Sequence, residues 1–347
     1  MSPALQTSKY DVLVGISSGI DSTYALHWFL SQNKNPLALF LSTGYNAGAI
    51  DKAKYICKKL GAALKIRDIS EEFNQLVIEK TKSLYGQGLT PNPCVICNHE
   101  IKFRFLFETA MEENIPFIAT GHYASIAKDS HERLRLAQTK DSRKDQSYFL
   151  YKLLNQDLSK ILFPLQYKGK TEIEREISDI LPDFFSKESQ DLCFIKKNYR
   201  AELFRGKTQP GYIYNEKKEL LGMHKGLRNY TIGQREGLGI EKPGPWYVYD
   251  IDAENNCLFV GDKAAAEKKE VFFLLEAPKK PPELKSNIVL SAKIRYNQEK
   301  LPVSKIEYLG DNKLRVVFKN KAFAPAAGQV IVLYEGDFIF AGGTILK

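Results

Sequence analysis

The chain has 347 residues, of which 44% are hydrophobic and 26% charged, a composition that excludes a largely disordered protein and predicts two or three domains. No apolar run approaches the roughly 18 residues that span a bilayer, and residues 1–10 lack an apolar signal core, so we expect a cytoplasmic protein without a membrane partner. The excess of 50 Lys and Arg over 41 Asp and Glu favours a polyanionic partner, although a basic solvated surface has the same composition.

Strand and helix patterns alternate over the first two hundred residues. Strands are predicted at residues 10–15, 37–41, 64–69 and 117–120, and helices at 22–30, 50–60, 71–83 and 100–112. This alternation predicts an α/β fold with a parallel sheet covered on both faces. Because such sheets bind ligands at the carboxyl ends of their strands, Gly15–Ser22, the residues after Leu41 and Thr120–Tyr123 are candidate site segments.

From about Arg200 the pattern changes to short strands separated by Gly, Pro and Asn. These strands are predicted at residues 211–214, 246–251, 257–260, 288–294, 303–308, 314–318, 330–334 and 338–340. Residues 310–312 and 335–337 have turn compositions. The C-terminal part is therefore expected to be a small antiparallel barrel or sandwich.

A loop of small residues, Gly15-Ile-Ser-Ser-Gly-Ile-Asp-Ser22, lies between the first predicted strand and helix. Small residues let backbone N–H groups approach phosphate oxygens, and a helix N-terminus adds about half a positive charge. The loop has no Gly-Lys-Ser/Thr, which excludes the usual phosphoryl-transfer loop. Phosphate binding is the interpretation we favour, although a plain strand-to-helix turn also uses Gly and Ser.

The loop resembles the SGGxDS pyrophosphate loop of the PP-loop ATP pyrophosphatases. Further blocks resemble the tRNA-specific 2-thiouridylases and follow in that family's order: TPNPCVICN (90–98), IKF (101–103), GHYA (121–124), KDQSYFL (144–150), ESQDLCFI (188–195) and YTIGQREGLGI (230–240). The resemblance extends from residue 11 to about residue 330.

The resemblance implies a PP-loop catalytic domain (residues 1–198), a small central domain (199–264) and a C-terminal antiparallel β-barrel that contacts tRNA (265–347). In the implied reaction, ATP with Mg²⁺ adenylates the wobble uridine of tRNA (position 34), and sulfur then replaces O2. The implied partners are the anticodon stem-loop of tRNA and a sulfur donor such as a cysteine desulfurase or sulfur-relay protein.

The family also implies site residues. The implied ATP-binding residues are Gly15, Ile16, Ser17, Ser18, Gly19, Ile20, Asp21, Ser22, Leu41 and Gly121. The implied tRNA-binding residues are Asn92, Pro93, Cys94, His122, Lys144, Asp145, Gln146, Arg295, Tyr296 and Gln329. This mixture suits RNA, whose unstacked loop bases are held by stacking and hydrogen bonds. A lone histidine such as His122 is nevertheless often structural.

Five cysteines are too few and too scattered for a disulfide scaffold. Cys57 falls in a helical apolar stripe and Cys257 in a strand-like stretch, so both are expected to pack in cores. The family match implies that Cys193 carries a persulfide and that Cys97 is the nucleophile, leaving a disulfide after sulfur release. Cys97 lies in a Pro-rich, non-periodic stretch, which we expect to be outside a helical core, with His99 and Lys102 nearby to favour the thiolate.

Cys94 and Cys97 form a CxxC, but a zinc site needs two further ligands and no second pair of this kind occurs. Members of the family often have Asp at the position of Cys94, which argues against an essential thiol there. An iron–sulfur cluster on Cys94, Cys97 and Cys193 is an alternative.

Three departures from the family pattern leave other functions open. Ser18 replaces a usual glycine, Leu41 replaces a common Met, and Ser42–Ala49 is shorter than the usual insertion. If position 18 has positive φ, Ser introduces strain of about 1 kcal/mol. The competing hypotheses are a tRNA-binding protein with a degenerate nucleotide site and another PP-loop enzyme.

Overall fold

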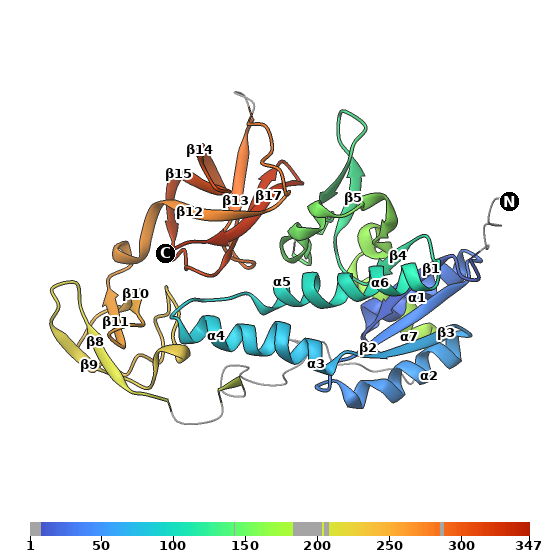
Figure 1. The fold of residues 1–347 in the computed structure, drawn as a ribbon, viewed down its shortest axis with the longest axis horizontal. Coiled ribbons are helices and arrows are strands. Elements are labelled where there is room, and N and C mark those ends of the chain that lie inside the picture. Colours follow the sequence, from blue (N-terminus) through green and yellow to red (C-terminus); the bar gives the residue numbers. More distant parts are fainter. Residues whose placement is uncertain (1–7, 142, 183–202, 205–207, 285–287) are drawn as a thin grey trace. The chain divides into compact units, whose positions relative to one another are not determined.

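The computed structural model describes residues 8–141, 143–182, 203–204, 208–284 and 288–347 (Figure 1). The chain divides into two compact units, residues 1–77 with 94–194 and residues 78–93 with 195–347. Among the described helices, none is both long enough and apolar enough to cross a bilayer.

The first unit contains a five-stranded parallel sheet in the order β3-β2-β1-β4-β7. The strands are β1 (Val12–Ile16), β2 (Pro36–Ser42), β3 (Ala63–Asp68), β4 (Ile118–Thr120) and β7 (Ile161–Leu162). In register, Leu13 of β1 lies opposite Leu37 on one side and Ile118 on the other. The chain winds outward from β1 to β3 and then returns to β4, so the order of strands reverses between β1 and β4. Ligands of open α/β sheets bind at this position.

Helices cover both faces of the sheet, as predicted (Figure 1). On one face lie α1 (Ile20–Ser31), α2 (Ile50–Leu60) and α7 (Lys170–Ile180), and α6 (Arg104–Glu112) lies on the other. The core between the sheet and the first three helices includes Val14, Tyr24, Ile56, Cys57 and Ile173. Cys57 is buried in this core, as predicted, and burial raises the pKa of its thiol to about 11.

Two predicted helices differ from the observed ones. The helix predicted at 71–83 is α3 (Ser70–Phe73), a π-helical stretch (Asn74–Glu79) and α4 (Lys80–Gly86). The helix predicted at 100–112 begins earlier, with α5 (Pro93–Cys97) and a second π-helical stretch (Asn98–Phe103) before α6. Proline is favoured in the first turn of a helix, where its missing N–H costs no hydrogen bond. The expectation that Cys97 lies outside a helical core was therefore wrong, because Cys97 is the last residue of α5 and is buried.

The remaining elements of the first unit are short. They are a hairpin of β5 (Ser125–Lys128) and β6 (Leu134–Ala137) and 3-10 turns at Ala47–Ala49, Ser147–Asn155, Leu158–Lys160 and Pro164–Tyr167.

The first strands of the second unit form a four-stranded sheet in the order β10-β11-β8-β9. These strands are β8 (Gly211–Tyr214), β9 (Leu220–His224), β10 (Tyr247–Asp252) and β11 (Cys257–Gly261). One face packs into a core with Tyr230 and Leu238, from the segment between β9 and β10, which includes a 3-10 turn at Leu227–Asn229. Cys257 is buried in β11, as expected for a packing residue.

The C-terminal strands form a closed antiparallel barrel, one of the two architectures that the alternating pattern allowed and the one that the family resemblance implied. After a 3-10 turn at Ala264–Ala266, its strands are β12 (Glu267–Ala277), β13 (Leu290–Lys293), β14 (Leu301–Gly310), β15 (Lys313–Phe323), β16 (Val330–Glu335) and β17 (Phe338–Ile345). Their order is β12-β15-β14-β13-β16-β17, and pairing of β12 with β17 closes the barrel. Phe273, Phe318 and Leu333 are buried in its interior. The predicted turn at 310–312 connects β14 to β15, with Asp311 and Asn312 in the left-handed conformation.

His224 is a buried structural residue of the second unit. Its Nδ1 accepts a hydrogen bond from the Gly226 N–H at 3.0 Å, and its Nε2 lies 3.0 Å from the carbonyl oxygen of Asn256. The ring is therefore neutral, with the proton on Nε2. Burial lowers the pKa of this imidazole, and the bond to Asn256 partly offsets that effect.

We predict that His224 makes the second unit less stable in mild acid. Below about pH 6.5 the unfolded chain takes up a proton that the folded imidazole resists, so the free energy of unfolding falls as pH drops toward the lowered pKa. His224→Gln, which cannot be protonated in this range, should flatten the dependence of the thermal midpoint on pH between 7 and 5. The exposed His131→Gln should leave it unchanged, and equal pH slopes in all three proteins would contradict the assignment.

Candidate active site

The predicted pyrophosphate loop, Ser17–Ser22, connects β1 to α1. Its form is held by the Ser22 hydroxyl, which accepts from the Ser17 N–H at 3.0 Å and donates to the Gly19 carbonyl at 3.0 Å. Gly19 is the N-cap of α1 and makes no side-chain cap. The first N–H groups of a helix have no partner within the helix, so this end of α1 can receive an anion.

Ser18 has a φ of +65° and is buried. This is the left-handed conformation in which the family's glycine carries no strain, whereas Ser at this φ is strained by about 1 kcal/mol. The Ser18 hydroxyl donates a 2.8 Å hydrogen bond to the carbonyl oxygen of Ala49, just before α2. A side-chain bond of this kind contributes about 1 kcal/mol, which offsets the strain.

Gly121, immediately after β4, packs directly against the start of α1. A Cβ at this position would lie 2.6 Å from the carbonyl carbon of Asp21 and from the amide nitrogen of Ser22. Those atoms are backbone, so they cannot move aside as the end of a flexible side chain can. Only glycine therefore allows the β4 loop and the pyrophosphate loop to meet where the strand order reverses.

Asp21 joins the same two loops through its carboxylate. Its Oδ1 accepts hydrogen bonds from the Tyr123 hydroxyl at 3.0 Å and from Lys170 Nζ at 2.8 Å. The Lys170 side chain is only 10% exposed. The structure thus places a largely buried cation, from the first turn of α7, beside the pyrophosphate loop.

His122 follows Gly121 and contacts the helix that contains Cys97. Its ring stacks on Phe103, with centroids 5.8 Å apart, and its Nδ1 lies 2.9 Å from the Thr120 hydroxyl. Burial and then the nearby Lys102 cation hold the pKa of His122 well below its ordinary value. The imidazole is therefore neutral near pH 7 and can act as a hydrogen-bonding or stacking group.

Cys97 lies at the carboxyl edge of the sheet. The helix that ends as α6 leads into β4 and runs antiparallel to it, so residues before Phe103 extend beyond the edge where His122 lies. Cys97 precedes Phe103 by six residues, and Asn98–Phe103 is the π-helical stretch. The Cys97 side chain is 5% exposed. The pyrophosphate loop and Cys97 are thus at one edge of one unit, and Cys193 lies outside the described residues.

The structure does not test the iron–sulfur hypothesis. Within the described residues, no three His, Cys, Asp or Glu side chains group to hold a metal ion. Because the hypothesis requires Cys193 together with Cys94 and Cys97, it stays a prediction. His99, which we expected to supply a cation near Cys97, lies 3.3 Å from the carboxylate of Glu100, which offsets any charge on its ring.

Comparison with known proteins decides the family. Residues 10–197 match the "tRNA methyl transferase HUP domain", residues 204–262 the "tRNA methyl transferase PRC-barrel domain" and residues 268–345 the "Aminomethyltransferase beta-barrel domain". The chain is 37% identical to the tRNA-specific 2-thiouridylase MnmA of Trichormus variabilis, with 96% of this chain and 98% of that protein aligned. It is 33% identical to the protein of the same name from Acetivibrio thermocellus, over 97% of this chain and 99% of that one. The chain belongs to the tRNA-specific 2-thiouridylase family.

The departures from the thiouridylase pattern have local structural consequences. After β2, the Asn46 side chain accepts from the Thr43 N–H and donates to the Leu41 carbonyl, both at 2.9 Å. Residues Ala47–Ala49 then lead directly into α2. The shortened segment is therefore a tight, hydrogen-bonded connection. Leu41 is half-buried at its start.

The three neighbouring thiouridylase residues 144–146 differ in exposure and in role. Asp145 is 1% exposed, and its carboxylate accepts from the Thr139 N–H at 3.1 Å and from the Ser147 hydroxyl at 2.7 Å. Gln146 bonds to the backbone of Tyr123 in both directions. Lys144 is partly exposed. Asp145 therefore shapes the loop from within, whereas Lys144 and Gln146 are both partly exposed and can be reached from solvent.

The predicted tRNA residues of the second unit lie on or next to segments that hydrogen bonds join. The Thr90 N–H, two residues before Asn92, donates to the Ala327 carbonyl at 2.8 Å, next to the turn that contains Gln329. Gln329 Oε1 is buried and accepts no hydrogen bond from the described residues. Arg295 donates from Nη2 to the carbonyls of Ile232 and Ala324 at 2.7 and 3.1 Å. Tyr296 is half-exposed beside it.

Sequence reasoning missed Lys170 and Tyr123 as neighbours of the pyrophosphate loop. Tyr123 lies within the GHYA motif, but its hydroxyl reaches Asp21 only because Gly121 brings the two loops together. Lys170 is 149 residues from Asp21 in the chain. Its position at the start of a helix after a short strand was the available signal, since that places it at the carboxyl edge.

We predict that Gly121→Ala lowers ATP-dependent pyrophosphate release by about ten- to hundredfold, because the added methyl group displaces the start of α1. Gly86→Ala is the matched control, since a Cβ at Gly86 would meet nothing within 4 Å. The measurement is the rate of pyrophosphate release with tRNA present, after circular dichroism has shown that both variants fold. Wild-type activity in Gly121→Ala would mean that the close approach is unimportant.

Proposed function

We propose that this protein is an ATP-dependent tRNA-uridine 2-sulfurtransferase that thiolates the wobble uridine. Membership of the thiouridylase family over nearly the whole chain supports the activity. The structural observation that supports the mechanism is that His122, next to the glycine that meets the pyrophosphate loop, stacks on Phe103 of the helix that contains Cys97. A degenerate tRNA-binding protein would need neither the tight fit at Gly121 nor a cysteine on that helix.

In the first step, ATP binds with its phosphates at the N-terminus of α1. We propose that ATP enters with Mg²⁺ and that the N–H groups of Ser18–Asp21 hold the pyrophosphate part. Lys170 offsets the negative charge of Asp21, its ion-pair partner, at the end of α1 where the phosphates bind. The O2 of the uridine attacks the α-phosphorus, the bond to the β-phosphate oxygen breaks, and pyrophosphate leaves. The base is left as an adenylate at O2.

In the second step, sulfur replaces the adenylated oxygen. We propose that Cys193 arrives as a persulfide, loaded by a donor such as a cysteine desulfurase or a sulfur-relay protein. The Cys97 thiolate attacks the Cys193 sulfur and forms a disulfide, and the terminal sulfur leaves as hydrosulfide. Hydrosulfide attacks C2 of the base and AMP departs with the original oxygen. An external dithiol then reduces the disulfide before the next cycle.

For the RNA, we propose contacts from residues 92–94, His122 and Lys144 around the reacting base and from Arg295, Tyr296 and Gln329 on the barrel. A neutral His122 can hold an unstacked base by hydrogen bonding or stacking. The buried acceptor Oε1 of Gln329 has an unmet hydrogen-bonding capacity that a ribose hydroxyl or a base amine would satisfy. Asp145 and Gln146 then act by holding the Lys144 loop.

We predict that Cys97→Ser abolishes formation of 2-thiouridine but leaves tRNA binding and pyrophosphate release within about threefold of wild type. The hydroxyl cannot attack a persulfide, whereas the adenylation step does not use this residue. The measurement is the amount of 2-thiouridine, found by liquid chromatography and mass spectrometry of the nucleosides from tRNA incubated with the protein, ATP and a persulfide donor. Cys57→Ala is the control because Cys57 is a core thiol. Full thiolation by Cys97→Ser would rule out the proposed role.

A companion variant separates the persulfide mechanism from the iron–sulfur alternative. We expect Cys94→Ala to retain at least a third of the thiolation rate and the protein as purified without oxygen to contain no stoichiometric iron. Three-cysteine ligation predicts the reverse, because loss of one ligand removes the cluster. Iron content and the thiolation rate of Cys94→Ala, measured on the same preparation, decide between the two.

A further inference from the structure

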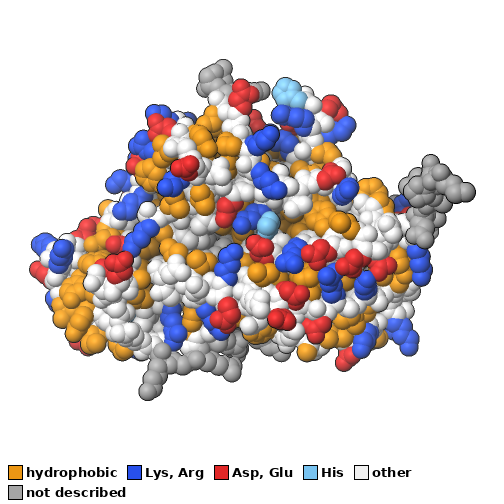
Figure 2. Space-filling model, viewed as in Figure 1, with side chains coloured by type: hydrophobic (Ala, Val, Ile, Leu, Met, Phe, Trp, Pro, Cys, Tyr) orange, Lys and Arg blue, Asp and Glu red, His pale blue; other side chains and the backbone are white. Residues whose placement is uncertain are grey.

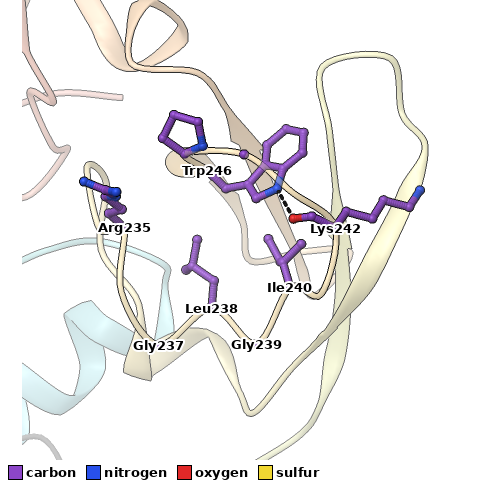
Figure 3. Close-up of a pocket in the computed structure, with 9 residues that line it drawn as sticks. Arg235, Gly237, Leu238, Gly239, Ile240, Lys242 and Trp246 are labelled. Atoms are coloured by element: carbon purple, nitrogen blue, oxygen red, sulfur yellow. Dashed lines mark hydrogen bonds between the residues drawn. The ribbon is translucent and has the colours of Figure 1, made fainter.

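A basin of about 230 Å³ lies on the segment between β9 and β10 in the second unit (Figure 3). It belongs to the block of residues 230–240, which has no role in the proposed reaction. The residues that line it are Arg235, Gly237, Leu238, Gly239, Ile240, Lys242, Gly244, Pro245 and Trp246. Leu238 and Tyr230 anchor this segment in the core beneath. The segment that forms the basin is therefore held in place by the hydrophobic core.

The basin has two cations and no lining carboxylate. Arg235 and Lys242 are exposed and lie at opposite ends of the basin, with the Lys242 side chain directed away from Arg235, whereas the exposed Glu236 and Glu241 are not part of the lining (Figure 3). No described carboxylate lies within ion-pair distance of either cation. Elsewhere, basic and acidic side chains are interspersed over the face in Figure 2. The net charge alone thus marks no binding face, and what distinguishes the basin is a lining that contains cations and no carboxylate.

The floor of the basin is exposed backbone. Gly237 and Gly239 both have positive φ, +73° and +68°, so side chains are disfavoured there although space is open around them. Within the described chain, the N–H groups of Gly237, Leu238 and Gly239 donate no hydrogen bond. Successive free N–H groups in a glycine-rich turn form a concavity that suits an anion.

Trp246 closes one side of the basin. Its Nε1 donates to the Lys242 carbonyl at 3.1 Å, which fixes the indole and ties the two ends of the turn together (Figure 3). The indole is half-buried. An aromatic face next to exposed cations is the combination that proteins use to hold a nucleotide's base or ribose beside its phosphate.

Arg295 and Gly233 hold this segment in place. Arg295 donates to the Ile232 carbonyl, and a Cβ on Gly233 would lie only 2.4 Å from the Cβ of Ala324 on the barrel side of the unit. The position of the segment is therefore fixed at Gly233, two residues before Arg235. Arg295, a predicted tRNA contact, would thus act partly as a positioning residue for the basin.

We infer that this basin binds the sugar-phosphate backbone of the tRNA substrate, with a phosphate at the N–H groups of Gly237–Gly239 between Arg235 and Lys242, and a ribose or unstacked base against Trp246. The inference rests on the proposed function, which supplies the RNA. The volume is below the roughly 300 Å³ of typical small-molecule sites, which favours a fragment of a larger ligand over a whole free cofactor. A phosphodiester with part of its nucleotide does.

The test compares tRNA binding by the wild type, Arg235→Gln/Lys242→Gln and Lys34→Gln/Lys58→Gln, by fluorescence anisotropy at several salt concentrations. The basin variant should weaken binding about tenfold and reduce the slope of log Kd against log salt by about one to two. The control variant removes the same charge from exposed lysines at the amino edge of the parallel sheet and should change neither quantity.

A second readout reports on the basin itself. The chain has two tryptophans, Trp28 and Trp246, so Trp28→Phe leaves Trp246 as the single reporter. Its emission should shift or be quenched when tRNA is added and should recover at high salt. The inference fails if wild type binds tRNA while the basin variant has an unchanged Kd and slope and Trp246 does not respond. Absence of tRNA binding by wild type would instead overturn the proposed function.

Discussion

The contact between two stretches of backbone at Gly121 is the constraint on which the first unit's site depends. The loop after β4 meets the first turn of α1 with no room for a single methyl group. This contact determines where Tyr123 lies and allows its hydroxyl to reach Asp21, which in turn holds Lys170. His122, one residue further, reaches Phe103 on the helix that begins at Pro93. Phosphate-binding backbone, a buried cation and the Cys97 helix are thereby assembled at the point where the strand order reverses.

The sequence allowed the layers of the fold to be predicted because buried strands and amphipathic helices have distinct periods. The parallel sheet and the order of elements follow from those patterns, and α2 was predicted with its observed bounds. For the C-terminal strands the pattern allowed a barrel or a sandwich, and the choice of a barrel came from the family resemblance. The start of the helix that contains Cys97 was not predicted, because residues 92–97, which include Asn, Pro and two Cys, show no helical spacing of apolar residues. The π-helical stretches also have no period that pattern analysis detects.

The roles of individual site residues were harder to predict than helices and strands, because tertiary contacts determine whether a side chain is buried and what it bonds to. Ser18 was expected to be strained if φ were positive, and it has that φ, but its compensating bond to Ala49 joins residues 31 positions apart. Asp145 is polar and lies in the KDQSYFL motif, yet its carboxylate accepts hydrogen bonds from Thr139 and Ser147, which are close to it in the chain. Lys170 had no motif at all and lies beside the pyrophosphate loop.

Both units hold anions, in our proposals, by the same physical means: bare N–H groups of a small-residue turn, supported by nearby cations. The central claim, however, is the sulfur relay at the edge of the parallel sheet. A single turnover with protein loaded as the persulfide, quenched in acid and mapped by mass spectrometry, tests it most directly. We expect a disulfide between the peptides of Cys97 and Cys193 in an amount equal to the 2-thiouridine formed. Thiouridine formed while both cysteines remain thiols would contradict the relay.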